Sequence, residues 1–419
     1  MLEKAYSFYI KKGDPPTIAL AILFHLLNTY DTAIDNVITA GLRSRLMDII
    51  SFVKKDYLLM ISAALAFISL LIVPFDTVLT YDYMRIVETI CTLLMFLLIV
   101  AGLKECNVLN KLAQKMLSDV KSTRMLCIAL ILMPFFCAML FSNDVALLTF
   151  VPLAIAILSM ADMKRATIGV LVLQTVAANV GSFLTPFGNP HNLYIFNLKD
   201  AYGFTLWDYE TALIPIVAMG TVVLLAMTLM MRNKPLKFGM DQEINIKNKT
   251  TVFIILALFI LAIITVIDFI PFYVTVLIII VAFLIMMPGI FKKVNYSILL
   301  IFFFLFVFAS GLTNMEYVHS LLTGLMNWDP MLTTVITSQF TSNVPSTILL
   351  QPFTDDWAAV LVGADIGGFG TPIASMASII TLKLYLQEKD SSVRNYLKVF
   401  LIVNITMLAV LIPTYYIFV

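Results

Sequence analysis

Two short polar strings, one in each half of the chain, hold residue types that suit ion and anion binding. Ser142-Asn143 and Ser342-Asn343 belong to a frame of Ser, Asn and Pro that recurs after 200 positions. An asparagine side chain offers one carbonyl acceptor and two amide donors, so it ligates a cation or holds an anion without carrying a buried charge. The neighbouring serine adds a small hydroxyl group. We therefore predict that a substrate anion, and also a sodium ion, binds at these four residues.

A second pair of strings follows the first pair. Residues 178–186 and 364–372 share five of nine positions, and both contain Gly and Pro inside otherwise apolar sequence. Duplicated strings of this kind indicate helices that are broken at mid-membrane depth to form a transporter's binding site. Further substrate contacts are predicted from Thr185, Asn189 and Thr371. Ion coupling is predicted from Asp144, Asn179, Gly181, Asp365 and Gly367.

Asp144 and Asp365 are the ionisable carboxylates within these motif regions. A carboxylate at membrane depth costs at least ~2.5 kcal/mol, so it usually faces a cavity and binds a cation or a proton. Asp365 occupies the position of Asn179 in the other half, which suggests one cation site in each half. The alternative role for Asp365 is to cap the broken helix. His191 remains open between a functional role, in which it donates to a substrate oxygen or titrates near neutral pH, and a structural role.

The composition indicates a chain that lies in a bilayer. Of its 419 residues, 61% are hydrophobic and 13% are charged, and the mean hydropathy is +0.97. Uncharged runs close to the ~20 residues that cross hydrocarbon cover 57–75, 211–231, 250–267, 269–291 and 399–419, and a shorter run at 89–103 begins its span at Met84. A net charge of +1 without a basic block excludes nucleic-acid binding. The four cysteines lack the spacing of a zinc site or a disulfide framework.

The distribution of Lys and Arg predicts the topology. If the Lys- and Arg-rich loops are cytoplasmic, as the positive-inside rule asks, residues 125–163 must enter and leave the membrane on the cytoplasmic face. By the same logic, residues 331–354 form a re-entrant hairpin from the opposite face. The broken helices then cover 166–196 and 357–386, running in opposite directions. The alternative is that each Ser-Asn segment is an ordinary kinked span and that the charge bias is accidental.

These inferences predict an all-α polytopic membrane protein with two inverted-topology repeats, each with a re-entrant hairpin and a broken transmembrane helix. Residues 1–54 are predicted to be an N-terminal cytoplasmic or interfacial extension. The first repeat covers 55–231, a cytoplasmic linker covers 232–249, and the second repeat covers 250–419. The N-terminus is predicted to be cytoplasmic and the C-terminus outside, in the plasma membrane.

The paired strings resemble those of the ion transporter superfamily, which includes divalent-anion/sodium symporters, citrate permeases and arsenite efflux permeases. In its dicarboxylate branch a Ser-Asn-Thr signature binds sodium and a substrate carboxylate, whereas Asp144 and Val344 hold the third position here. The Asn143-Asp144 pair is similar to arsenite permeases, and Gly188–Asn192 is similar to citrate and general anion permeases. The resemblance also implies a homodimer whose hairpins and broken helices move against a fixed scaffold, an elevator-type mechanism.

The expected function is secondary active transport of a small anion, such as citrate or a dicarboxylate, coupled to sodium or protons. No nucleotide-binding or hydrolase motif occurs in the sequence, so neither an enzyme nor an ATP-driven pump is predicted. No cofactor is expected apart from sodium. Arsenite or antimonite efflux and sodium/proton antiport remain as alternatives. A passive channel is less consistent with paired closed hairpins.

Overall fold

The computed structural model describes residues 57–79, 81–117, 120–236, 245–388 and 391–419. The chain divides into two compact units, residues 1–60 and 61–419. All of the motifs lie in the second unit. Within the described residues the chain forms nineteen α-helices, α4 to α22, and no β-strand. The predicted extension over residues 1–54 lies outside the described residues.

Eight helices of the described part are long and apolar enough to cross a membrane. They are α6 (Tyr83–Glu105), α8 (Thr123–Leu140), α9 (Asn143–Met160), α10 (Thr167–Phe183, extended by the 3-10 turn Lys164–Ala166), α13 (Leu206–Leu229), α14 (Lys249–Val266), α16 (Tyr296–Thr313) and α22 (Val393–Phe418). Shorter apolar helices are α4 (Tyr57–Ile72), α15 (Phe272–Met286), α20 (Trp357–Gly367) and α21 (Met376–Tyr385). Large exposed hydrophobic side chains on these helices, with the exception of α10, α20 and α21, fit contact with lipid. The predicted polytopic all-α class is therefore confirmed.

Seven further helices in the described residues are short or amphipathic. They are α5 (Phe75–Val78), α7 (Val108–Leu117), α11 (Pro190–Phe196), α12 (Lys199–Tyr202), α17 (Glu316–Trp328), α18 (Pro330–Thr341) and α19 (Asn343–Leu350). Two 3-10 turns, Pro288–Lys292 and Gln351–Phe353, complete the described elements. In both halves the order of elements is the same around the motifs: an apolar helix, an amphipathic helix, a helix–turn–helix, and a helix broken by a loop.

The first helix–turn–helix consists of α8 and α9. Helix α8 begins where the Ser122 hydroxyl accepts the backbone N–H of Met125 at 3.2 Å, which satisfies one of the free donors of the first turn. It ends at Leu140, and Ser142 has an extended backbone, with φ −165°. Helix α9 therefore begins at Asn143 and runs back along α8. These helices occupy the predicted hairpin at 125–163, and its re-entry in a membrane stays a prediction.

The second helix–turn–helix consists of α18 and α19. The Asp329 carboxylate accepts the N–H of Leu332 at 2.8 Å, and Pro330 occupies the first helical position. The turn lies at Ser342, whose φ is +76° and ψ is 153°. Side chains other than Gly rarely adopt this conformation, and the strain they store is of order 1–3 kcal/mol. The second tip therefore has a strained residue at the centre of its Ser-Asn motif.

Both predicted broken helices are interrupted at their Gly- and Pro-containing strings. Helix α10 ends at Phe183 and α11 begins at Pro190, while α20 ends at Gly367 and α21 begins at Met376. Close packing against the hairpins requires glycine before each break. A Cβ on Gly181 would lie 2.1 Å from the Phe135 carbonyl oxygen, and one on Gly367 would lie 2.7 Å from Ser338 Oγ. This packing accounts for both glycines, and their predicted part in ion coupling stays a prediction.

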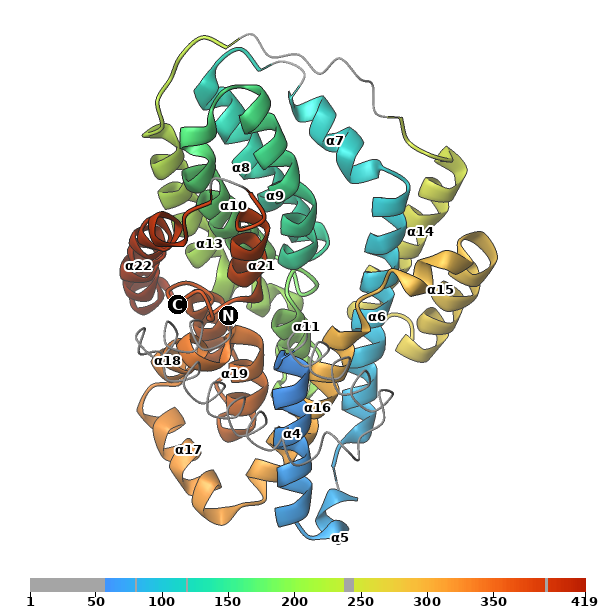
Figure 1. Ribbon diagram of the computed structural model, residues 1–419. Helices are drawn as coiled ribbons and strands as arrows, with labels where there is room; N and C mark the ends of the chain where they lie inside the picture. Colours follow the sequence, from blue (N-terminus) through green and yellow to red (C-terminus); the bar gives the residue numbers. More distant parts are fainter. Residues whose placement is uncertain (1–56, 80, 118–119, 237–244, 389–390) are drawn as a thin grey trace, which may run out of the picture. The chain divides into compact units, whose positions relative to one another are not determined.

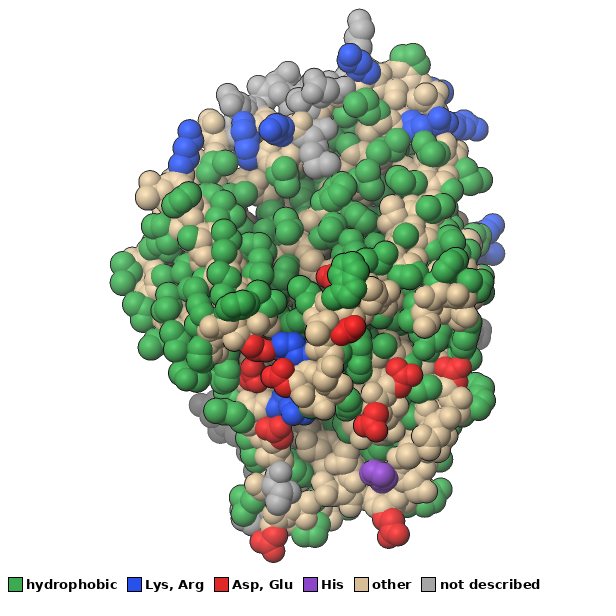
Figure 2. Space-filling model, turned by 180° about the vertical axis from the view of Figure 1, so that it is seen from behind, with side chains coloured by type: hydrophobic (Ala, Val, Ile, Leu, Met, Phe, Trp, Pro, Cys, Tyr) green, Lys and Arg blue, Asp and Glu red, His purple; other side chains and the backbone are tan. Residues whose placement is uncertain are grey.

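Helices α6 and α10 are each the centre of a set of packing contacts, and α16 packs against both α6 and α19. Helix α6 packs against α14, α15 and α16, whereas α10 packs against α8, α9, α13, α21 and α22. Figure 1 shows the α8–α9 pair and the α18–α19 pair in different parts of this unit, with the breaks before α11 and α21 between them. Figure 2 shows Lys and Arg gathered at one end, and most Asp and Glu elsewhere. The group around α10 therefore holds both breaks, and the group around α6 packs beside it.

Candidate ion and substrate site

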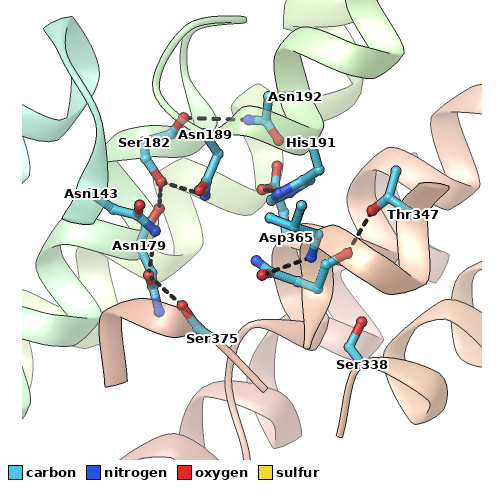
Figure 3. A network of polar contacts seen from close by, with 12 residues as sticks. Asn143, Asn179, Ser182, Asn189, His191, Asn192, Ser338, Thr347, Asp365 and Ser375 are labelled. Carbon is cyan, nitrogen blue, oxygen red and sulfur yellow. Dashed lines mark hydrogen bonds and ion pairs between the residues drawn. The ribbon is translucent and has the colours of Figure 1, made fainter. Parts of the chain in front are cut away.

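The first hairpin tip is held against the first break by Asn143. Its backbone N–H donates to the Gly188 carbonyl oxygen at 3.3 Å, and its Nδ2 donates to Asn179 Oδ1 at 3.1 Å. The N–H of Asp144 in turn donates to Asn143 Oδ1 at 2.8 Å. The Asn143 side chain is buried, with 3% of its surface exposed. Figure 3 shows it pointing toward Asn179, so the structure brings together two of the predicted site residues.

The second tip repeats this arrangement. The backbone N–H of Asn343 donates to the Ala374 carbonyl oxygen at 2.9 Å, and the N–H of Val344 donates to Asn343 Oδ1 at 3.0 Å. Ala374 holds the position in the second break string that Gly188 holds in the first. The two tips are thus attached to their breaks through equivalent atoms.

The predicted threonines also make equivalent contacts. Thr185 Oγ1 donates to the Met139 carbonyl oxygen at 2.6 Å, and Thr371 Oγ1 donates to the Gln339 carbonyl oxygen at 2.8 Å. Gln339 adds its side chain in the second half: its Oε1 accepts the N–H of Thr371, and its Nε2 donates to the carbonyl oxygens of Gly367 and Phe369. The two threonine hydrogen bonds therefore join each break to the last turn of the first helix of its hairpin, α8 or α18. Substrate contact by these threonines remains a prediction.

Asn179 lies where the two halves meet. Its Oδ1 accepts from Asn143 Nδ2 and, at 3.5 Å, from Ser375 Oγ of the second break. Its Nδ2 is buried without a hydrogen-bond partner in the described part of the chain. Asn189 lies beside this group, where its Nδ2 donates to Ser182 Oγ at 2.9 Å. Buried amide groups with unused hydrogen-bonding capacity are typical of sites that hold a ligand or water.

Asp365 has a different partner from the one that repeat symmetry suggests. His191 Nε2 lies 2.9 Å from Asp365 Oδ1, and both side chains are 0% exposed. No hydrogen bond joins Asp365 to Ser342 or Asn343 among the residues that the structure describes. His191 belongs to α11 in the first half and Asp365 to α20 in the second, so this pair bridges the repeats (Figure 3).

A cavity of about 440 Å³ reaches the first tip. Its wall contains the half-buried Ser142 and Asp144 at the start of α9, together with residues of α6, α16 and α21. Asp144 stands in the first turn of α9, where the partial positive charge of the helix end favours a carboxylate. Lys104 and Lys293 also line the cavity, and Lys293 pairs with Glu105. The cavity thus combines hydroxyl, carboxylate and ammonium groups.

The Ser-Asn pair of the second tip is buried away from this cavity. Ser342 and Asn343 are 4% and 3% exposed, and neither lines this cavity. A smaller cavity of about 40 Å³ extends beside the first tip and contacts Pro190 and Leu193 of α11. In this conformation, substrate-sized space therefore reaches the tip of the first half.

Sequence comparison identifies the family. The citrate transporter family model matches residues 46–360, which include both Ser-Asn strings and the first break. The chain belongs to the citrate transporter family. It is 32% identical over 320 residues to "Uncharacterized transporter MJ0456" of Methanocaldococcus jannaschii, an alignment covering 76% of this chain and 87% of that protein. It is also 26% identical over 301 residues to "Inner membrane protein YbiR" of Escherichia coli, covering 71% and 79% of the two chains. The resemblance drawn from the motifs is confirmed.

The sequence did not predict several site residues of this citrate transporter family member. Lys104 and Lys293 line the cavity from helix ends far from any motif, so only the fold places them there. Ser375 was detectable, because it occupies the position of Asn189 when the break strings are aligned. The pairing of His191 with Asp365 had no signal in the sequence spacing.

Proposed function

We propose that this protein is a secondary active transporter that moves a small carboxylate anion, such as citrate or a dicarboxylate, across the plasma membrane, coupled to sodium ions or protons. The observation that carries the proposal is the cavity at the first tip, where Ser142 and Asp144 face a space of about 440 Å³. Membership of the citrate transporter family supports the substrate class.

The chemistry of the cavity suits an anion that travels with a cation. Lys104 and Lys293 place ammonium groups on the cavity wall, where Glu105, paired with Lys293, and Asp144 balance their charge. The N-terminus of α9 adds partial positive charge close to Ser142. Asp144 would repel a carboxylate unless a cation lay between them, because like charges in a partly dry cavity interact strongly. Sodium ligands are proposed from Ser142 and Asn143 at the first tip and from Ser342 and Asn343 at the second.

The proposed movement follows from the two groups of helices. We assign α6, α14, α15 and α16 to a fixed scaffold, and the hairpins with their broken helices to a body that moves as one, in elevator-type alternating access. The repeats are proposed to be inverted, with both hairpins re-entrant and the Lys-rich end cytoplasmic. This orientation places the N-terminus in the cytoplasm and the C-terminus outside. A homodimer is proposed from the family resemblance.

Reconstituted vesicles test the proposal directly. Purified protein in proteoliposomes should accumulate radiolabelled citrate or succinate when an inward sodium or proton gradient is imposed, and should not do so after the gradient is collapsed with an ionophore. Protein-free vesicles and the double variant Asn143→Ala/Asn343→Ala serve as controls. Uptake that equilibrates without ever exceeding the outside concentration would indicate a channel.

Asp144 on the cavity wall supports a second candidate, sodium/proton exchange without an organic substrate. The same vesicles, loaded with a pH-sensitive dye, would then show sodium-driven pH changes in the absence of any carboxylate. Arsenite or antimonite movement is tested by adding either ion in place of citrate, with metal analysis of the vesicle contents.

A further inference from the structure

A histidine and an aspartate form a fully buried pair at the junction of the two halves. His191 Nε2 and Asp365 Oδ1 are 2.9 Å apart, and neither side chain is exposed. Each side chain has a second polar atom, Nδ1 in His191 and Oδ2 in Asp365. Neither atom has a hydrogen-bond partner in the residues the structure describes. An unpaired polar atom on a buried carboxylate is costly. Structural packing alone therefore leaves this pair unexplained.

The surroundings of the pair hold little compensating charge. Helix α20 packs against α10, α11, α13, α18, α19 and α22. Helices α10, α18 and α19 contain no Asp, Glu, Lys, Arg or His. The buried Tyr209 of α13 interacts electrostatically with Asp365. The other titratable groups on α11, α13 and α22 are the buried Tyr194 and Tyr396, the half-buried Glu210 and Tyr415, and the exposed Asp208, Arg394, Lys398 and Tyr416. Helix α6, which packs against α11, adds Tyr83, Arg85, Glu88, Cys91, Lys104 and Glu105.

The charge of the pair depends on one proton. A neutral imidazole beside a carboxylate gives the pair a net charge of −1, at a position with no solvent contact. One added proton brings the net charge of the pair to zero. Hard metal cations require several oxygen ligands, whereas His191 already occupies one oxygen of Asp365 with a nitrogen. A proton needs only the hydrogen bond that is present. The pair therefore suits a proton better than sodium.

The equivalent position in the first half confirms that the two halves differ in chemistry. Asn179 occupies the place of Asp365 and contacts Asn143 and Ser375, all uncharged. An amide there cannot bind or release a proton in the physiological range. At this pair of equivalent positions, only the second half therefore has a titratable group.

We infer that His191 and Asp365 together form a proton-binding site shared by the two halves, and that its single proton is a coupling ion of the transporter. This inference rests on the proposed function for its coupling role. The proton binds between Nε2 and Oδ1 while the pair is open to water on one side, and it leaves to water on the other side.

Helix α11 connects this pair to the cavity. Pro190 and Leu193, on either side of His191 in the sequence, line the smaller cavity together with Ser142 and Asp144. On this proposal, a substrate that contacts this wall shifts α11, and a shift of α11 relative to α20 changes the separation of His191 and Asp365. Substrate occupancy and proton affinity are therefore linked, as coupled transport requires.

Transport by two variants tests the coupling. Asp365→Asn and His191→Gln remove the titratable pair with little change in shape, and Asp355→Asn and His319→Gln make the same changes at exposed positions. In proteoliposomes we expect both site variants to lose accumulation driven by a pH gradient and to keep exchange of internal for external citrate at equal pH. The controls should keep both. Full accumulation by either site variant, or loss of exchange in folded protein, overturns the coupling role.

A second measurement tests the proton site without any transport. A ligand that binds the folded state alone stabilises it by mass action, so a proton held by the assembled pair and not by the separated side chains gives a stability that falls as pH rises. The thermal unfolding midpoint of the detergent-purified protein should show this decline in wild type and in both controls. The decline should be smaller in Asp365→Asn and His191→Gln, and an unchanged decline would overturn the proton site. A wild type that transports no carboxylate yet shows the decline refutes the proposed function alone.

Discussion

Asn143 and Asn343 make the same backbone hydrogen bond, each to the break string of its own half. The acceptors, the carbonyl oxygens of Gly188 and Ala374, are equivalent positions of the two strings. In the first half, the hairpin and the break string are therefore joined by two hydrogen bonds. One runs from Thr185 to Met139 of α8, and the other runs from Asn143 at the tip to Gly188. Hydrogen bonds at two levels therefore join each hairpin to its broken helix. This linkage supports the proposal that the hairpin and the broken helix of each half move as one body.

The inverted arrangement predicts which loops face which compartment. On a cysteine-free background, Lys234→Cys should react with a membrane-impermeant maleimide only from the cytoplasm, and Asn327→Cys only from outside, because the positive-inside rule assigns the Lys-rich end to the cytoplasm. Both side chains are exposed. Inside-out and right-side-out vesicles provide the two measurements. Labelling of both positions from the same side would refute the inverted repeats.

Gly181→Ala should destabilise the protein strongly, although it adds only one methyl group. The added Cβ would lie 2.1 Å from the Phe135 carbonyl oxygen, so α10 must move away from α8. Overpacking of this kind costs about 1–3 kcal/mol. Thermal unfolding in detergent measures the change.

The same helix offers a matched control. Gly169→Ala places its Cβ no closer than 3.5 Å to another side chain, at Met231. Replacing a helical glycine at such a position stabilises by about 0.4–1 kcal/mol. If the two variants unfold at the same temperature, α8 and α10 do not approach each other closely at Gly181.

Repetition in the sequence was the strongest guide to this fold. The offset of 200 positions between Ser142 and Ser342 located both helix–turn–helix elements, and the Gly- and Pro-containing strings located both breaks, because these residues interrupt helices by local chemistry. Contacts between distant helices could not be predicted in this way. The partner of Asp365 depends on how α11 packs against α20, and His191 has no repeat equivalent that would reveal it.

Substitution of the tip asparagines should abolish transport while the protein remains folded. Asn143→Ala removes the donor to Asn179 Oδ1 and the acceptor for the Asp144 N–H, which costs about 1–3 kcal/mol of stability if the remaining groups stay buried. Asn343→Ala removes the equivalent acceptor for Val344. Uptake should be lost in each, since the proposed sodium ligands are then missing.

A control separates this loss from general damage. Asn197→Ala also removes a side-chain hydrogen bond, from its Nδ2 to Thr89 Oγ1 at 3.2 Å, but away from both tips. It should retain uptake. Normal uptake in Asn143→Ala and Asn343→Ala would place the binding site elsewhere, whereas misfolding of both would make them structural residues.

Lys104 should tune substrate affinity through its charge. Its side chain lines the cavity, so Lys104→Gln weakens attraction for an anion by about 0.2–1 kcal/mol, or up to about fivefold in apparent affinity. High salt should reduce the difference from wild type, because exposed charges are screened. Lys121→Gln removes an exposed lysine outside the cavity and should leave the Michaelis constant for uptake unchanged. An equal effect of the two variants would exclude a local role for Lys104.

The proposed movement predicts that a tether across the cavity stops turnover. Val145 belongs to α9, on the moving body, and Leu97 belongs to α6, on the scaffold; both side chains line the same cavities. In a cysteine-free protein carrying Leu97→Cys and Val145→Cys, a short bifunctional thiol reagent should join the two helices. Uptake should then fall to the level of protein-free vesicles, because the body that carries the site cannot cross.

Binding distinguishes a trapped carrier from a damaged one. The tethered protein should still show substrate-dependent thermal stabilisation, since the first tip remains accessible from one side and a ligand that binds only the folded state raises its stability. Each single-cysteine variant, treated with the same reagent, should transport normally, and a reducible reagent should allow recovery after reduction. Undiminished flux through the tethered protein would mean that the two helix groups do not move past each other, and the path would then be a channel.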